Sequence, residues 1–157
     1  MLIQFQEYLS LENIYLWANF GILPFWILLI IAPSSKITQF FVNSIILPLM
    51  LSTAYIYVIY QSILLDEAIF DVFGLYLGLN NLYTILSAEH FLLFFWLHFL
   101  ALNIFLGSWI SRDGIKYNIS RSIILLPLVL VYFAGPVGLV LYWVVRVFYA
   151  KRISFHD

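Results

Sequence analysis

Hydrophobic residues occur along this chain in four long runs, and short polar stretches separate them. The runs cover roughly residues 14–32, 40–65, 90–110 and 122–146. Each is close to the roughly 20 apolar residues that a helix needs to cross the hydrocarbon core of a bilayer at about 1.5 Å per residue. The pattern predicts an all-α, polytopic membrane helix bundle with four transmembrane helices.

Turn and capping residues mark the ends of these runs. Ser10 suits the N-cap of the first helix, and Pro33-Ser34-Ser35-Lys36 ends that helix. Asp66-Glu67 follows the second run, and we expect residues 111–120 to form a polar loop after the third. Gly135-Pro136 lies in the fourth run and predicts a kink or local unwinding near its middle.

Residues 66–87 follow a different pattern from the four runs. Apolar residues recur at helical spacing, while Asp71, Asn80 and Asn81 would be costly at the centre of a bilayer. We predict an amphipathic segment that lies along the membrane interface.

Composition supports a membrane protein, because 64% of the 157 residues are hydrophobic and only 10% are charged. The length and the lack of a linker predict a single membrane domain over residues 1–157. The formal net charge of −1, without a basic run, gives no reason to expect nucleic acid. Residues 1–10 lack the features of a signal or transit peptide, which favours direct insertion into a bacterial inner or thylakoid-type membrane.

The basic residues decide the orientation only weakly if all four runs cross the membrane. Lys36, Arg112, Lys116 and Arg121 then lie on one side, and Arg146, Lys151 and Arg152 lie on the other. The acidic residues favour both termini outside, although acids contribute little to the rule that governs orientation.

Polar and aromatic residues recur every seven positions within two of the runs. Such residues share one face of a helix, and they are Glu12, Asn19 and Trp26 in the first run and Glu89, Trp96 and Asn103 in the third. His98 lies on nearly the opposite face, so we expect the third helix to pack on both sides. The two asparagines either hold helices together, by bonding each other or backbone carbonyls exposed at Pro24 and the Gly-Pro break, or contact a ligand.

His98 has a structural and two functional interpretations. It can donate a hydrogen bond to a neighbouring helix, act as a general acid or base because imidazole titrates near neutrality, or serve as an axial ligand to a pigment metal. A haem held by two histidines is not expected, because His90 and His98 share one helix and His156 lies in the tail. The sequence has no His-Glu-x-x-His pair and no phosphate-binding glycine loop, and we predict no metal site.

Three blocks of sequence resemble a known family. The blocks are Asn19-x-x-x-Leu23-Pro24-Phe25-Trp26 closing at Pro33, Trp96-x-His98-x-Leu100-Ala101-x-Asn103-x-Phe105-x-Gly107 followed by Asp113-Gly114, and Gly135-Pro136-Val137-Gly138-Leu139. In this order they resemble the neoxanthin-synthase-like (abscisic-acid-deficient type) integral membrane proteins of plants, algae and bacteria. Residues 66–87 are the least alike. Asn103 stands where we expect an aspartate in the family, so a proton-transfer role of that carboxylate is in doubt here.

The resemblance implies an intramolecular isomerase of xanthophylls, in which an epoxide opens and a proton leaves the end of the polyene to give an allene. Such chemistry needs an acid and a base, and His98 is the candidate catalytic residue. The candidate ligand-binding residues are Asn19, Trp26, Trp96, Asn103 and Gly135, and the ligand is a bound carotenoid or other isoprenoid pigment. The alternative is a non-catalytic pigment- or lipid-binding small subunit of a photosynthetic or respiratory membrane complex. Expected partners are membrane lipid, the isoprenoid ligand, and a larger complex or a second copy of the chain.

Overall fold

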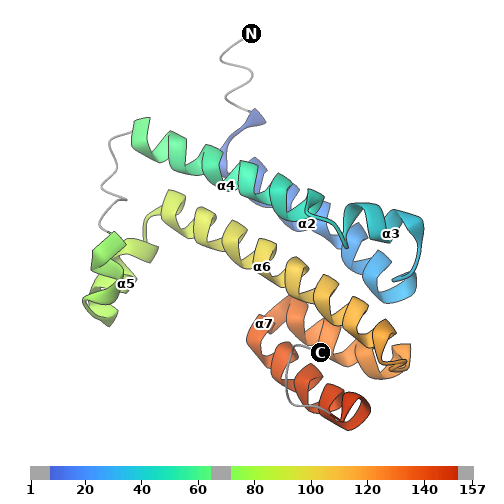
Figure 1. The fold of residues 1–157 in the computed structure, drawn as a ribbon. Coiled ribbons are helices and arrows are strands. Elements are labelled where there is room, and N and C mark those ends of the chain that lie inside the picture. The colour runs from blue at the N-terminus through green and yellow to red at the C-terminus, as the bar shows by residue number, and fades with distance from the viewer. Residues whose placement is uncertain (1–7, 65–71, 152–157) are drawn as a thin grey trace. The chain divides into compact units, whose positions relative to one another are not determined.

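A computed structural model describes residues 8–64 and 72–151, and the described residues form helices and no strands. Four helices are long and apolar enough to cross a membrane (Figure 1), namely α2 (Leu11–Ile31), α4 (Ile46–Leu64), α6 (Glu89–Lys116) and α7 (Arg121–Ala150). Three shorter helices are α3 (Lys36–Phe41), η1 (Val72–Tyr76) and α5 (Leu79–Leu86). The all-α membrane fold predicted from the hydrophobic runs is confirmed.

The second hydrophobic run begins in the last residues of α3, and the membrane helix begins at Ile46 and not at Phe40. A serine hydroxyl accepts a backbone N–H at the start of each of the two helices. Ser35 caps α3 by accepting from the Thr38 N–H at 3.1 Å, and the Ser44 hydroxyl accepts from the Ile46 N–H at 3.2 Å at the start of α4. Each cap satisfies a backbone donor that has no partner inside its helix.

The third run extends farther than its apolar residues do. α6 continues to Lys116, so the expectation that residues 111–120 form a loop is wrong for 111–116, and residues 117–120 make the connection. Asn118 has a φ of 52°, in the left-handed region that closes such a turn. The helix tolerates polar residues at this end because Asp113 has partners on α7.

Residues 72–86 form η1 and α5, as two short helices and not one. The exposed Gly78 separates them, with a φ of 139° that L side chains rarely adopt. Residues 66–71 of the predicted interfacial segment, which include Asp71, lie outside the described residues. That the segment lies at the interface stays a prediction.

Contacts divide the chain into two compact units. The first unit comprises residues 1–21 and 49–100, and the second comprises residues 22–48 and 101–157. α2 and α6 each contribute to both units. The single domain expected from the length stays a prediction.

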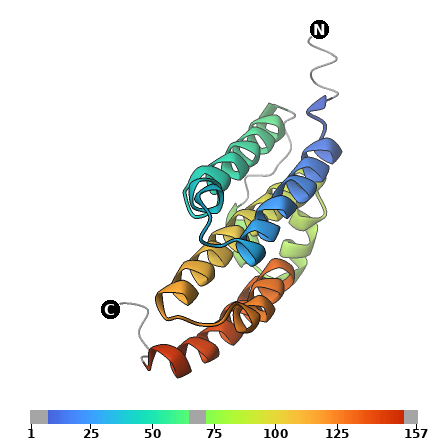
Figure 2. The same cartoon turned by 90° about the vertical axis from the view of Figure 1, so that its right-hand side faces the viewer.

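Within the second unit, α7 doubles back on itself. Ala134 and Gly135 have non-helical backbone angles, which confirms the predicted break. Beyond it, Gly138 lies so close to the first arm that an added Cβ would stand 2.3 Å from the Val131 nitrogen and 2.6 Å from the Pro127 carbonyl oxygen. The two arms of α7 can therefore be followed side by side in Figures 1 and 2.

The break also decides where the C-terminal end of α7 lies. Gly114 of α6 faces both Ile124 from the first arm and Tyr142 from the second. The C-terminal end of α7 thus lies beside the C-terminal end of α6, which is also next to the start of α7. The expectation that Arg146 and Lys151 lie on the opposite side from Lys116 is wrong, because it assumed that α7 continues straight through the break.

Candidate functional site

The first unit contains an open groove between the start of α2 and the start of α6. Its volume is about 490 Å³, and its lining consists of Leu11, Glu12, Tyr15, Glu89, Leu92, Leu93 and Trp96. Leucines and aromatic rings make most of the surface, and two carboxylates are the charged groups of the lining. The groove therefore combines an apolar floor with the carboxyl groups of two glutamates.

A hydrogen-bonded pair of side chains fixes the aromatic wall of this groove. The Trp96 indole Nε1 donates to the Asn19 Oδ1 at 3.1 Å, and the Asn19 Nδ2 donates to the Tyr15 carbonyl oxygen at 2.7 Å. The rings of Tyr15 and Trp96 lie 6.3 Å apart between centroids, at 42°. Within the first unit, the two helix faces that carry the seven-residue repeats do meet.

Glu12 and Glu89 occupy equivalent places, since each lies in the first turn of its helix and each is exposed on the groove. A carboxylate in the first turn interacts favourably with the positive end of the helix dipole. Sequence analysis did not name Glu12 or Glu89 as a candidate site residue. The signal was the seven-residue spacing from Glu12 to Asn19 and from Glu89 to Trp96, which places both carboxylates beside the aromatic wall.

His98 lies on another face of α6 from Trp96. Its side chain is exposed, and its ring lies 6.3 Å from the ring of Tyr55 on α4. Tyr55 also packs edge-on against Phe94 at 5.4 Å. The prediction that the third helix packs on both sides is confirmed within the first unit, but His98 does not join Asn19 and Trp96.

Asn103 and Gly135 come together at the break of α7. Asn103 is buried, and an added Cβ at Gly135 would stand 2.5 Å from its Oδ1. A side chain larger than glycine therefore cannot enter this contact without movement. The Asn103 Nδ2 has no hydrogen-bond partner among the described residues. Asn19 bonds Tyr15 and Trp96 instead of a second asparagine. Asn103 lies against Gly135 of the Gly-Pro break, but its Nδ2 makes no bond there to a described carbonyl, so the expected hydrogen bond to an exposed carbonyl is not seen.

Trp26 belongs to the core of the second unit. It is 4% exposed, and an added Cβ at Gly107 would stand 2.6 Å from its Cη2 atom. Its ring meets that of Tyr132 in a T-shaped contact at 5.5 Å. The same tryptophan lines an apolar groove of about 180 Å³ together with Leu23, Ile27, Ile30, Leu128, Val129, Tyr132 and Phe133.

A buried polar cluster in the second unit was not predicted from the sequence. The Asp113 Oδ2 accepts from the Arg146 Nε and from the Tyr142 hydroxyl, both at 2.7 Å, and the Arg146 Nη2 lies 3.3 Å from the Tyr117 hydroxyl. Arg146 is only 1% exposed. The cluster joins the second arm of α7 to the end of α6. The Asp113-Gly114 pair was the signal, although sequence analysis placed it in a loop.

The predicted ligand-binding residues therefore divide between two places. Asn19 and Trp96 form the wall of the groove, whereas Trp26, Asn103 and Gly135 make packing contacts in the second unit. Within residues 8–64 and 72–151, no three His, Cys, Asp or Glu side chains are grouped so that they could hold a metal ion. The groove is the described region that combines ligand-sized space with acid and base groups.

The comparisons with known proteins agree with the family resemblance of the sequence blocks. No curated protein and no solved structure matches the chain. The model of the family described as ABA DEFICIENT 4-like matches residues 13–142, which include Asn19, Trp96 and the break of α7. Because this match covers most of the 157 residues, the chain belongs to the ABA DEFICIENT 4-like family, whose members are integral membrane proteins of the neoxanthin-synthase-like kind.

Proposed function

We propose that this protein isomerises an epoxy-xanthophyll to an allene at the groove between α2 and α6. Family membership supports a protein of the neoxanthin-synthase-like kind. The observation that carries the proposal is the placement of two carboxylates, Glu12 and Glu89, beside the aromatic wall of one groove.

The reaction needs one acid and one base. A protonated carboxyl donates its proton to the epoxide oxygen as a carbon–oxygen bond breaks, and the oxygen becomes a hydroxyl. A carboxylate removes a proton from the neighbouring vinylic carbon, and the electrons of that C–H bond form the second double bond of the allene. Substrate and product are isomers, so no oxidant or reductant is consumed. One carboxyl ends protonated and the other ionised, and exchange with water resets them.

The groove provides these groups together with a surface for the substrate. Tyr15 and Trp96 present aromatic rings against which a conjugated chain or an end ring can pack, and the leucines add apolar area. The hydrogen bond that Trp96 donates to Asn19 fixes the tryptophan ring, which reduces the freedom lost when a ligand binds. Both helices begin at this groove, and the polar end ring of a xanthophyll also prefers the membrane edge.

His98 is the second catalytic candidate. Imidazole titrates near neutrality, and Tyr55 lies beside it. It lies outside the groove, however, and α4, which carries Tyr55, has no Asp or Glu. The groove supplies two proton-transfer groups where this face supplies one.

Conservative variants separate the two candidate sites. Glu12→Gln, Glu89→Gln and His98→Gln are each purified, placed in liposomes with an epoxy-xanthophyll, and assayed by chromatography for a product of unchanged mass. We expect each glutamate variant to lose roughly 100-fold or more in rate, the usual effect of removing an acid or base, and His98→Gln to keep its rate. Equal thermal unfolding of all variants shows that the fold is intact.

Two results would show that the catalytic site is not in the groove. If both glutamate variants convert at the wild-type rate, the groove is not the site. If only His98→Gln loses conversion, the face with Tyr55 carries the chemistry.

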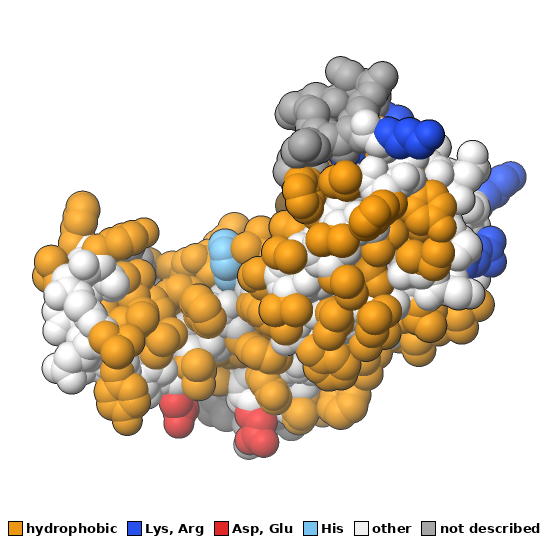
Figure 3. Space-filling model, turned by 90° about the horizontal axis from the view of Figure 1, so that it is seen from below, with side chains coloured by type: hydrophobic (Ala, Val, Ile, Leu, Met, Phe, Trp, Pro, Cys, Tyr) orange, Lys and Arg blue, Asp and Glu red, His pale blue; other side chains and the backbone are white. Residues whose placement is uncertain are grey.

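A non-catalytic pigment- or lipid-binding subunit is the second candidate function. The apolar groove beside Trp26 favours it, because aliphatic and aromatic side chains line it. Hydrophobic side chains also cover most of the face drawn in Figure 3. An absorption spectrum of the gently extracted protein, with identification of co-purifying chains, decides between the two. Bound pigment without conversion would favour the subunit.

A further inference from the structure

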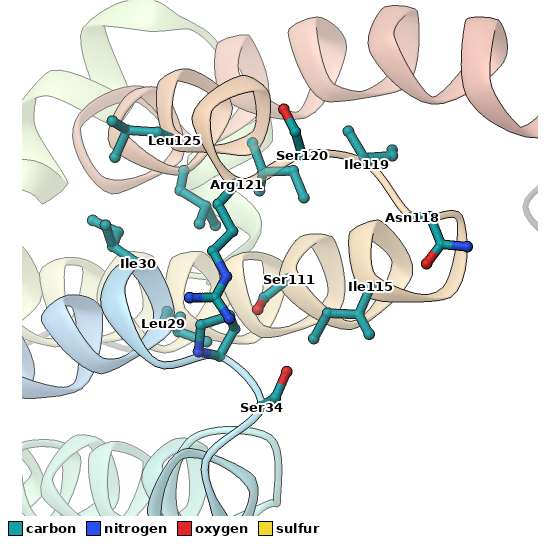
Figure 4. Close-up of a pocket in the computed structure, with 13 residues that line it drawn as sticks. Leu29, Ile30, Ser34, Ser111, Ile115, Asn118, Ile119, Ser120, Arg121 and Leu125 are labelled. Atoms are coloured by element: carbon teal, nitrogen blue, oxygen red, sulfur yellow. The ribbon is translucent and has the colours of Figure 1, made fainter.

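A second pocket, unrelated to the groove, lies in the second unit where three helix ends meet (Figure 4). The end of α2, the end of α6 and the start of α7 enclose about 320 Å³. Leucine and isoleucine side chains form its floor. Its polar lining consists of Ser34, Ser111, Asn118, Ser120 and Arg121. The pocket is therefore apolar on one side and rich in hydrogen-bond donors on the other.

Ser111 indicates that this pocket holds a ligand. It is 2% exposed, and its hydroxyl has no hydrogen-bond partner among the described residues. Buried hydroxyls normally have one, because leaving a polar group unpaired in a dry interior is costly. Figure 4 shows this hydroxyl directed toward the Arg121 guanidinium. A ligand with an acceptor oxygen between the two would satisfy the hydroxyl.

The remaining donors around the pocket favour a negative charge. α7 begins here, and the N–H groups of its first two residues, Arg121 and Ser122, have no acceptor inside the helix. The N-cap residue Ser120 makes no side-chain cap bond. The Arg121 guanidinium makes one long contact, from Nη1 to the Ile31 carbonyl oxygen at 3.4 Å, out of five N–H donors. A helix start, an arginine and a buried hydroxyl are the elements of a phosphate site.

We propose that this pocket binds the phosphate group of an anionic phospholipid, with the glycerol and the upper acyl chains over its leucine and isoleucine floor. The lipid source follows from the placement of charge. Lys36 follows the end of α2 at the start of α3, and Arg112 and Lys116 lie near the end of α6. The doubled-back α7 adds Lys151 to these basic residues, because its second arm returns to the end of α6. Such a basic end faces the cytoplasmic or equivalent leaflet, where anionic lipids are enriched. The nearest acid on α6, Asp113, is paired with Arg146.

A competing explanation is that Arg121 only caps the end of α2 through the Ile31 carbonyl. A positive side chain is favourable at a helix C-terminus without any ligand. Ser111 separates the explanations, because its hydroxyl contributes to ligand binding but not to that cap.

The test measures lipid retained by the whole protein. Wild type, Ser111→Ala, Arg121→Gln and the matched control Arg112→Gln, an exposed residue that does not line the pocket, are placed in nanodiscs of phosphatidylcholine and phosphatidylglycerol. Native mass spectrometry then counts the phosphatidylglycerol kept after release. We expect Arg121→Gln to lower the preference for phosphatidylglycerol roughly five-fold, as for loss of one basic contact at a membrane surface. Ser111→Ala should lower it as well, without lower thermal stability in phosphatidylcholine alone.

Three results would overturn the proposal. Equal losses in Arg121→Gln and Arg112→Gln would show general surface attraction, and unchanged retention in Ser111→Ala would leave Arg121 as a helix cap. The third result comes from adding inorganic phosphate to the protein in nanodiscs of phosphatidylcholine alone. If it stabilises wild type but not Ser111→Ala, and phosphatidylglycerol adds nothing, the phosphate comes from solution and the lipid assignment is wrong.

Discussion

The buried ion pair between Asp113 and Arg146 should be the strongest single tie between α6 and the second arm of α7. Replacing Asp113 with asparagine keeps the shape of the side chain but removes its charge. Arg146, at 1% exposure, then keeps its buried positive charge but loses the carboxylate charge of Asp113. Breaking a buried pair from one side costs about 3–5 kcal/mol. Because Asp113 is itself 10% exposed, we expect the low end, about 3 kcal/mol.

Unfolding in detergent, followed by circular dichroism, measures this cost. The double variant Asp113→Asn with Arg146→Met should recover much of the lost stability, because it buries neither of the two charges of the pair. Tyr142→Phe removes one hydrogen bond to the Asp113 Oδ2 and should cost about 1 kcal/mol. Arg112→Gln, on the exposed surface of the same helix, should stay within about 0.5 kcal/mol of wild type. If Asp113→Asn is as stable as wild type, the pair does not hold α7 in its doubled-back form.

Two further predictions concern the path of the chain and its packing. The protein has no cysteine, so single cysteines placed at Lys116, Lys151 and Ser10 can be labelled selectively in intact membranes. The cysteines at positions 116 and 151 should label from one side of the membrane, and the cysteine at position 10 from the other. Labelling of positions 116 and 151 from opposite sides would show that α7 continues straight across. Gly107→Val should destabilise the protein by about 1–3 kcal/mol through overpacking against Trp26, which thermal unfolding measures, and an unchanged melting temperature would mean that the tryptophan moves aside without cost.

Much of the helical architecture could be predicted because a membrane sets helix length directly. Apolar runs of the required length identified all four long helices. Their ends were harder, since residues 111–116 look like a loop until Asp113 is seen to have partners on α7. That pairing joins residues 33 apart, a separation for which no helical repeat gives a signal.

The candidate site was predictable where its residues repeat along a helix. The seven-residue spacing brought Asn19 and Trp96 onto facing surfaces, and the structure joins them. The same periodicity placed His98 away from Trp96, but periodicity alone does not distinguish an exposed face from a second packed face. Gly135-Pro136 predicted the break of α7, whereas its direction depends on the packing of Gly138 against the first arm, which is a tertiary contact.

The central claim is that the protein moves a proton from carbon as an epoxide opens. Purified protein in liposomes is given an epoxy-xanthophyll that carries deuterium at the vinylic carbon next to the epoxide, with no added cofactor. The account predicts an allenic product that has lost this deuterium to water, formed more slowly than from unlabelled substrate and not formed by the Glu12→Gln, Glu89→Gln double variant. Substrate that stays bound and is recovered unchanged, with its deuterium in place, would contradict the account.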